Sequence, residues 1–262
     1  MKLYVRADTI DPLDEDRQLK FTMAADPNTR LATLRRLAND PDDMVRSCVA
    51  SNPAAPLDLL ESLIDSHGAR YEISRRDDVP DDFLRKYADK YEDFAWGLCR
   101  RSACTPEELA KFYELYNEAP HSTGLMMHIA KNRNTPPEVL DKLANYPDTA
   151  YMVLGNVANN PNTSFDTLEW ILSKPDKGMS SDTYKLVGHA ALRNLEKRDR
   201  QHYIDVLARL SMSPKWKVRK LAASDMNTPL IHLDRLCSDD PVSYVRKEAG
   251  ETIEMRRRFG RL

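Results

Sequence analysis

Apolar residues along this chain gather in short blocks with the spacing of an amphipathic helix. In the block 45–52 (Val45 to Asn52) the apolar side chains lie three and four positions apart, and an alanine stands two residues before the closing asparagine. The same order of residue types returns in blocks 126–132 and 153–160, and in block 218–225 with aspartate as the last residue. This spacing puts one apolar stripe on one helix face, and the alanine lets a neighbouring backbone approach closely. The pattern predicts a short helix in each block.

A second, longer helix is predicted after each short one. The segments Thr105-Pro106-Glu107-Glu108 and Thr135-Pro136-Pro137-Glu138 both place threonine at the cap, proline at the first helical position and glutamate at the third. Such a threonine accepts a backbone N–H, and the glutamate can accept the N–H of the cap residue in return. Leucines follow at helical spacing, and we expect Leu60 and Leu143 to be interior.

Polar turns separate the predicted helices. Turns rich in asparagine, proline and threonine, such as 160–163, follow the short helices, where they should end the helix and redirect the chain. Stop signals such as 39–42 (Asn-Asp-Pro-Asp) follow the longer helices. We expect an aspartate of these signals to cap the first helix of the next unit.

The pairs of helices recur with a regular period. A step of 24 residues without a gap carries Val45 onto Ala69 and Leu60 onto Leu84. A repeat of this length is one supersecondary unit that buries its apolar face only against its neighbours. Counting such units gives about eight, anchored near residues 29, 56, 80, 106, 136, 164, 195–205 and 229. The sequence therefore predicts an all-α protein, an α-solenoid with an extended concave surface.

Three parts are predicted along the chain. Residues 1–19 are rich in aspartate and form a polar N-terminal cap, and residues 20–241 form the helical repeat solenoid. Residues 242–262 begin another unit and then run into consecutive arginines, so we expect a C-terminal capping helix with a basic tail. Terminal repeats must cover an apolar face, which explains why both ends differ from the consensus.

The best-preserved unit resembles a known family. The run from Asp40 to Arg46, the segment from Val49 to Pro53, and then Pro56 and Leu60 are similar to the variant leucine-rich repeat, a relative of HEAT-like helical repeats. This resemblance implies a right-handed stack in which short and long helices alternate. Some members of that family carry a cysteine-ligated iron–sulfur cluster beside the repeats. Neither end of this chain has a C-x-x-C run, so the resemblance implies no cluster here.

Composition limits the class of protein. Apolar residues make up 41% of the 262 residues and charged residues 31%, as in a folded chain with a well-solvated exterior. No apolar run approaches the roughly 18 residues of a membrane span, and the first residues lack the apolar stretch of a signal peptide. The four cysteines are scattered, which favours a reducing setting. We therefore predict a cytoplasmic protein that does not bind membranes.

Charge is unevenly distributed along the chain. The net charge of −2 combines 17 Lys and Arg against 24 Asp and Glu in residues 1–119 with 11 against 7 in residues 212–262. This gradient from an acidic front to a basic tail could orient a partner. The whole molecule lacks the strongly basic balance of a general nucleic-acid binder.

No group of residues has the spacing of a reactive or metal-binding site. Cys99 and Cys104 are followed by His121 and His128, but the paired C-x₂₋₄-C spacing of a metal centre is missing. The six histidines lie in different repeats, and with only eight glycines no phosphate-binding loop is present. The sequence predicts no enzyme, no metal, no cofactor and no small-molecule substrate.

The main candidate binding site is a basic patch near the C-terminus. Lysines and arginines in 215–220 surround one tryptophan, and more arginines follow one to two units later, so stacked repeats could bring them to one face that neutralises phosphates. The candidate residues are Lys215, Trp216, Lys217, Arg219, Lys220, Arg246, Arg256, Arg257 and Arg258. The alternative is that the tryptophan packs and the cations are only solvated or pair within the chain. Arginines recur at equivalent repeat positions, where they are suited to pair with acidic neighbours or with the carboxylates of a partner, and we expect the pairing within the chain: Arg46, Arg70, Arg219 and Arg246.

Two functions follow. The first is a non-enzymatic scaffold whose concave face binds a macromolecular partner, most simply another protein. The alternative is a nucleic-acid-binding repeat protein that uses the basic patch, similar to the HEAT-like alkylation-repair DNA glycosylases. Trp96, Trp170 and Trp216, each with aspartates near in sequence, are candidate aromatic residues for that alternative.

Overall fold

The computed structural model describes residues 12–147, 151–174 and 179–260, with side chains from residue 16 onward. The chain divides into two compact units, Met1–Ala103 and Cys104–Leu262. Within the described ranges every regular element is an α-helix. The predicted all-α class is therefore confirmed. No described helix has both the length and the apolar character to cross a membrane.

The described residues of the N-terminal unit form seven helices. They are α1 (Pro12–Ala25), α2 (Leu31–Leu37), α3 (Asp43–Ser51), α4 (Leu57–Glu61), α5 (His67–Arg75), α6 (Asp81–Ala88) and α7 (Glu92–Cys99). The C-terminal unit contains the other described helices. They are α8 (Pro106–Tyr116), α9 (Thr123–Lys131), α10 (Pro137–Ala144), α11 (Tyr151–Asn159), α12 (Phe165–Ser173), α13 (Ser181–Arg198), α14 (Arg200–Ser211), α15 (Trp216–Ala223), α16 (Leu230–Asp239) and α17 (Ser243–Arg258).

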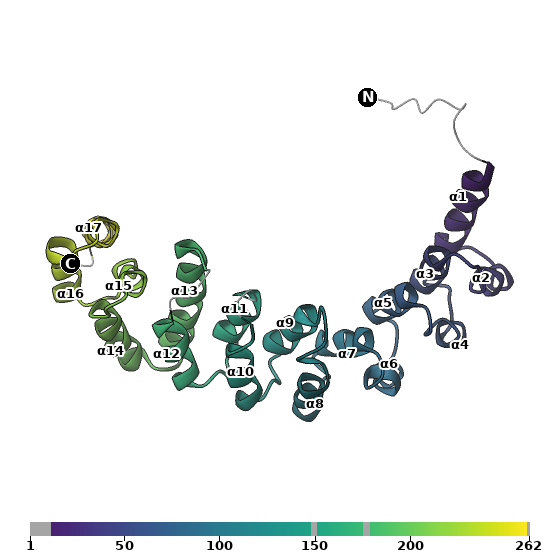
Figure 1. Ribbon diagram of the computed structural model, residues 1–262, viewed down its shortest axis with the longest axis horizontal. Coiled ribbons are helices and arrows are strands. Elements are labelled where there is room, and N and C mark those ends of the chain that lie inside the picture. Colours follow the sequence, from purple (N-terminus) through teal and green to yellow (C-terminus); the bar gives the residue numbers. More distant parts are fainter. Residues whose placement is uncertain (1–11, 148–150, 175–178, 261–262) are drawn as a thin grey trace. The chain divides into compact units, whose positions relative to one another are not determined.

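Within each unit, odd-numbered helices pack against the next odd-numbered helix. In the N-terminal unit α1 contacts α3, α3 contacts α5 and α5 contacts α7; in the C-terminal unit the sequence of contacts runs through α9, α11, α13, α15 and α17. Figure 1 shows the even-numbered helices of the C-terminal unit along the opposite side of that row. The interior lies between the two rows, where Leu60 and Leu143 are 0% and 1% exposed, as predicted.

The even-numbered helices from α2 to α16 begin close to the eight predicted anchors. The predicted alternation of short and long helices is not followed. Helix α3 has nine residues and its successor α4 has five, whereas α7 has eight and α8 has eleven. Helix length varies because packing against the neighbouring repeat stabilises these short helices more than their own propensity does.

One predicted capping box is confirmed and the other is wrong. Thr105 accepts the N–H of Glu108 at 3.2 Å, and the Glu108 carboxylate accepts the N–H of Thr105 at 2.8 Å. Thr135 is instead fully buried and donates its hydroxyl to the Ile129 carbonyl, while Pro136 takes the cap position of α10. The position of Thr135 within the repeat corresponds to Cys104, one residue earlier than Thr105. Thr163 and Thr228 occupy the same position and donate to Val157 and Ala222 at 2.6 Å.

The prediction that aspartate caps the next unit is confirmed at Asp42, which ends the stop signal at 39–42. Its side chain accepts the N–H of Met44 at 2.9 Å at the start of α3. This hydrogen bond satisfies one of the donors that a helix leaves unpaired at its N-terminus.

The asparagine at the end of a predicted short helix also forms hydrogen bonds to the preceding repeat. Asn160 is 3% exposed, and its Nδ2 donates to the carbonyls of Ala130 and Asn132 in the preceding repeat, both at 2.8 Å. Asn52 makes the corresponding pair of bonds to the carbonyls of Ala24 and Asp26, at 2.7 and 2.9 Å. Carbonyls at a helix C-terminus have no partner within their own helix, so each asparagine satisfies two of them in its neighbour.

Arginine takes the place of this asparagine in later repeats of the N-terminal unit. Arg76 donates to the carbonyls of Ala50 and Asn52 at 3.0 and 2.7 Å, and Arg101 donates to the Arg76 carbonyl at 2.7 Å. A guanidinium has five N–H donors in a fixed fork, so it can bond several carbonyls at once.

The predicted boundaries after residue 19 and before residue 242 lie within α1 and just before α17. Helix α1 continues through residues 19 and 20, and residues 1–11 of the predicted polar cap lie outside the described residues. Helix α17 lies in the range predicted for a C-terminal capping helix.

Candidate functional site

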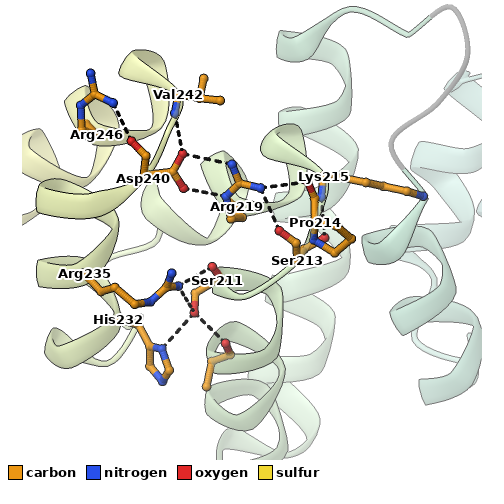
Figure 2. Close-up of polar contacts among 11 residues, drawn as sticks. Ser211, Ser213, Pro214, Lys215, Arg219, His232, Arg235, Asp240, Val242 and Arg246 are labelled. Carbon is orange, nitrogen blue, oxygen red and sulfur yellow. Dashed lines mark hydrogen bonds and ion pairs between the residues drawn. The ribbon is translucent and has the colours of Figure 1, made fainter.

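Arg219 of the predicted basic patch is buried and used within the chain. Its Nε and Nη2 donate to the two carboxylate oxygens of Asp240 at 2.6 and 3.0 Å, and its Nη1 donates to the carbonyls of Ser213 and Pro214 at 2.9 and 3.0 Å (Figure 2). The Arg219 and Asp240 side chains are 10% and 1% exposed. The guanidinium therefore fixes the turn before α15 onto the turn after α16.

The pair is charged in the folded state. Burial raises the pKa of Asp240, but the hydrogen bonds from Arg219 and from the Val242 amide outweigh it, and the net pKa lies below its usual value. The hydrogen bond to Asp240 in turn raises the pKa of Arg219. Both charges are compensated locally, so Arg219 is not available to a ligand.

Arg246 and Arg256 also donate to backbone. Arg246 Nη1 bonds the Asp240 carbonyl at 2.5 Å, and Arg256 Nε bonds the Met226 carbonyl at 2.6 Å. Arg256 is 8% exposed. Of the four repeated arginines, Arg46, Arg70 and Arg219 each form an ion pair with an aspartate, whereas Arg246 bonds a backbone carbonyl. Arg46 and Arg70 also donate to the carbonyls of Asp40 and Ile64.

The three lysines of the patch each have a partner. Lys215 Nζ donates to the Ser173 carbonyl at 3.2 Å, and Lys217 Nζ donates to the Met179 carbonyl at 2.9 Å. Lys220 Nζ lies 3.8 Å from the Glu248 carboxylate, which also holds Lys185 at 2.6 Å. The lysines thus link α15 to its neighbours.

The remaining residues lie at the ends of two helices. Trp216 is the first residue of α15 and is 36% exposed. Arg258 in the last turn of α17 pairs with Glu254 at 2.5 Å. The exposed side chain of Arg257 makes neither a hydrogen bond nor an ion pair with the described residues. The structure therefore leaves few of the nine candidate side chains free to contact a partner.

A groove that sequence reasoning missed lies between α11 and α13. It has a volume of about 360 Å³, and apolar side chains dominate its walls. Tyr151, Met152 and Leu186 border it and are 49%, 57% and 69% exposed. Exposed apolar residues this close together are typical of a binding surface, and the volume lies in the range of ligand sites. A signal was present in the sequence, since Tyr151 and Met152 extend the apolar block of α11 beyond its buried stripe.

Gly155 and Asn156 of α11 line this groove. Gly155 has no side chain where α11 faces α13, and a Cβ added there would have Val187 Cγ2 as its neighbour at 3.9 Å. Asn156 donates to the Met127 carbonyl at 3.2 Å, which holds its amide against α9. Arg193 lines the groove from α13 and is exposed. Its guanidinium forms neither a hydrogen bond nor an ion pair with the residues that the structure describes. The groove thus combines an apolar surface with one cation.

A second cavity of about 360 Å³ lies among α12, α14 and the turn before α15. Its charged wall is occupied internally, because the two Glu169 oxygens lie 2.8 Å from His202 and 2.9 Å from Arg209. The cavity therefore offers no unpaired charge comparable to Arg193.

Two serine–histidine contacts lack the geometry of a nucleophile and its base. Ser211 Oγ lies 3.0 Å from His232 Nδ1, and Ser224 Oγ lies 3.1 Å from His189 Nε2. Each hydroxyl donates its proton to a carbonyl of its own helix, at 2.7 and 2.8 Å, so it acts as the acceptor toward histidine. Burial lowers the pKa of both imidazoles. Neither serine is activated by its histidine.

Cys99 and Cys104 are buried, and they form no disulfide. Among the described residues no three His, Cys, Asp or Glu side chains converge on a point where a metal ion could bind.

Comparison with known proteins does not assign the chain to a family. No protein-family model matches the chain, and no curated protein matches it. A crystal structure of an engineered protein is similar at 15% sequence identity, covering 94% of this chain and 96% of that one, with a TM-score of 0.32. A TM-score this low supports no conclusion about the fold.

Proposed function

We propose that this chain is a non-enzymatic, right-handed α-solenoid of about eight helix pairs, similar to variant leucine-rich and HEAT-like repeats, that binds another protein. The succession of contacts within each unit, from one odd-numbered helix to the next, supports the repeat arrangement. The four cysteines form no disulfide, which favours a reducing, cytoplasmic setting.

The groove between α11 and α13 carries the proposal. Leu186 is 69% exposed on α13 and Met152 is 57% exposed on α11. Two large apolar side chains beside the groove are therefore in contact with water. A partner that covers them gains about 25 cal/mol for each Å² of apolar surface removed from water. Anchors that fill such hollows dominate the binding free energy of protein interfaces.

The nucleic-acid alternative draws less support from the contacts of the basic patch. Binding to phosphates requires cations that can exchange bound counterions for the ligand. Arg219, Arg246 and Arg256 are instead engaged with Asp240 or with backbone carbonyls. The protein-binding function is therefore the one that we propose.

An affinity-capture experiment with a matched pair of variants tests the proposal. The full chain is immobilised, and proteins captured from a host lysate are compared with those captured by Leu186→Asp and by Ile231→Asp. Ile231 lies on α16 and is 77% exposed, so it controls for the loss of any exposed apolar residue. We expect Leu186→Asp to reduce capture about tenfold while Ile231→Asp has little effect. Capture that survives Leu186→Asp would contradict a function at the groove.

A salt titration distinguishes the nucleic-acid alternative from the protein-binding function. Binding of a labelled DNA duplex that falls steeply as salt rises, and that is lost in a Lys215/Lys217/Arg257 charge-reversal variant, would establish the nucleic-acid function instead. We expect no binding to the duplex even at low salt.

A further inference from the structure

The groove between α11 and α13 is lined by one face of each helix. The lining residues of α11 lie between Tyr151 and Asn159, and those of α13 recur at helical spacing. The residues of the α13 wall are Thr183, Leu186, Val187, Ala190 and Arg193. With a rise of about 1.5 Å per residue, this wall extends about 15 Å, which is the length of a helix of about three turns.

The two helices run in the same direction along the groove. Asn194 of α13 donates to the carbonyls of Ala158 and Asn160, at 3.0 and 2.7 Å, so this part of α13 lies beside the C-terminal end of α11. Nearer the start of both helices, a Cβ added at Gly155 would have Val187 Cγ2 as its neighbour at 3.9 Å. The order of contacts along α13 therefore follows the order along α11, as in parallel helices.

The parallel arrangement gives the groove an apolar end and a polar end. The exposed side chains of Tyr151, Met152 and Leu186 border the end where both helices begin. The other end is bordered by Asn159 and Arg193, which are exposed as well. Leu186 and Arg193 are seven residues apart on one helix, so their backbone positions are separated by about 10 Å along its axis.

Arg193 supplies an uncompensated charge at the polar end. Among the described residues that line the groove none is acidic, and α11 contains neither Asp nor Glu. A carboxylate from a partner would form charge-assisted hydrogen bonds with this guanidinium beside an apolar surface, where such bonds are stronger than in open water. One cation is too few to bind a nucleic-acid backbone, which requires several phosphate contacts.

The side-chain amides of the groove are already engaged, which favours a helical partner. Asn156 Nδ2 donates to the Met127 carbonyl at 3.2 Å, and Asn159 Nδ2 donates to the Gly155 carbonyl at 2.8 Å. An extended segment lying in the groove would therefore find few donors for its backbone carbonyls, and burying such groups unpaired is unfavourable. A helix bonds its own backbone and presents its apolar side chains to the groove.

We propose that this groove binds an amphipathic helix of a partner protein that carries a carboxylate seven residues, or two turns, from a large apolar side chain. The inference rests on the proposed protein-binding function and specifies the chemistry of the partner. The apolar side chain covers Met152 and Leu186, and the carboxylate pairs with Arg193. Gly155 and the buried Ala190 lie between these two points, so the partner helix can approach closely there.

Fluorescence anisotropy with a labelled synthetic helix tests the proposal on the full-length chain. The probe is an alanine-rich peptide with a stripe of leucines and with glutamate seven residues before and after the central leucine, so that it fits in either direction. One comparison peptide has glutamine in place of both glutamates. Another has proline in place of an alanine beside the central leucine, which breaks the helix. We expect saturable binding of the probe and about tenfold weaker binding of both other peptides.

A double-mutant cycle assigns the carboxylate to its partner. Arg193→Gln should weaken binding of the glutamate peptide about tenfold and leave binding of the glutamine peptide unchanged. Lys197→Gln is the matched control, because Lys197 is an exposed cation of the same helix that does not line the groove. Binding of both peptides should be unchanged in this control.

Gly155→Met tests the location of the peptide. A Cβ at this position makes only an ordinary contact with Val187, so the methionine side chain can occupy the groove while the fold is kept. The variant should lose binding of the glutamate and glutamine peptides. Its thermal midpoint should be at least that of the unchanged chain, because glycine is an unfavourable residue within a helix. Circular dichroism establishes that each variant is folded.

Four results would overturn the inference. The first two are equal binding of the glutamate and glutamine peptides, and unchanged binding of the glutamate peptide in Arg193→Gln. The third is tighter binding of a fluorescent fatty acid that Gly155→Met abolishes, which would assign the groove to a small apolar anion. The fourth is self-association that the same variant abolishes, which would assign the groove to a second copy of the chain.

Failure of this inference is distinguishable from failure of the proposed function. If the glutamate peptide does not bind while Leu186→Asp still reduces capture, the groove binds a protein of other chemistry and only this inference fails. If Leu186→Asp leaves capture unchanged, the proposed function at the groove fails, whatever the peptide does.

Discussion

The N-terminal unit joins its consecutive repeats with both asparagine and arginine at one position of the repeat. The neutral amide of Asn52 bonds two carbonyls of the preceding repeat, as Asn160 does in the C-terminal unit, whereas the guanidinium of Arg76 bonds an equivalent pair. Both satisfy carbonyls that a helix end leaves unpaired. The comparison shows that the repeat requires donors at this position and tolerates either charge state.

The two units also differ in the ion pair that is formed by the arginine near the start of the first helix of a repeat. Arg219 in the C-terminal unit binds Asp240 through both carboxylate oxygens, and the two side chains are 10% and 1% exposed. Its counterpart Arg70 binds Asp93 through one hydrogen bond at 3.1 Å, with 13% and 18% exposed. The equivalent arginine–aspartate ion pair is therefore more deeply buried in the C-terminal unit, and it has more hydrogen bonds there.

The largest effect is expected from breaking this ion pair. Arg219→Met should lower the free energy of unfolding by about 3–5 kcal/mol, because it leaves the Asp240 charge buried without a partner. Arg70→Met should cost less, since water reaches Asp93 more easily. Chemical denaturation followed by circular dichroism measures both variants, and equal costs would show that burial does not distinguish the two pairs.

The next effect compares interior leucines of the two units. Leu60→Ala in α4 and Leu143→Ala in α10 should each cost about 2–5 kcal/mol, because both side chains are enclosed and leave a cavity. Denaturation midpoints measure the change. A near-zero shift for one of them would mean that its unit unfolds locally before the rest.

Removing the donors that join repeats should have a slightly smaller effect. Asn160→Ala leaves the buried carbonyls of Ala130 and Asn132 without their partner, so we expect a loss of about 2–4 kcal/mol. Arg76→Ala should cost less, because its surroundings are only partly buried. Native-state hydrogen exchange in the adjoining helices is the measurement, and faster exchange for Arg76→Ala than for Asn160→Ala would reverse the expected order.

A smaller effect is expected at the residue three positions after the joining residue. Thr163→Val removes the hydrogen bond to the Val157 carbonyl while keeping the shape, and it should cost about 1 kcal/mol. The N-terminal unit has Val79 at this position, buried at 1% exposure, so Val79→Thr is the matched exchange. A stabilising effect of Thr163→Val would show that the hydroxyl is not needed.

The smallest expected effect is on the acid dependence of stability. The folded-state pKa of Asp240 lies below its ordinary value of 3.8, so its contribution is fully present above pH 3.8 and is lost as the pH falls further. Asp240→Asn should therefore flatten the fall of the denaturation midpoint below that pH. An identical acid profile in the variant would show that other carboxylates control it.

The helices were accessible from the chain alone because their signals are local. Apolar spacing, proline and cap residues act within a few positions, and they place the starts of α4, α6 and α8 close to the predicted anchors. Thr105 and Thr135 show the limit of this reasoning. Both precede proline and glutamate, yet Thr135 lies one position earlier in the repeat and bonds the Ile129 carbonyl.

The candidate site was less accessible because exposure depends on neighbours far along the chain. The basic patch could be found as a run of cations, but Arg219 pairs with a residue 21 positions away and Lys215 with one 42 positions away. The groove beside Leu186 is lined by residues of both α11 and α13, and the sequence of either helix does not show where the other lies.

The order of residues thus determined the period, the helices, the interior leucines and the arginines that bond within the chain. Only the packed structure decided which cations face water and where apolar side chains line a hollow. The physical reason is that the hydrogen bonds of a helix join residues four positions apart. Whether a charged side chain is free to bind a partner depends instead on carbonyls and carboxylates that neighbouring repeats contribute.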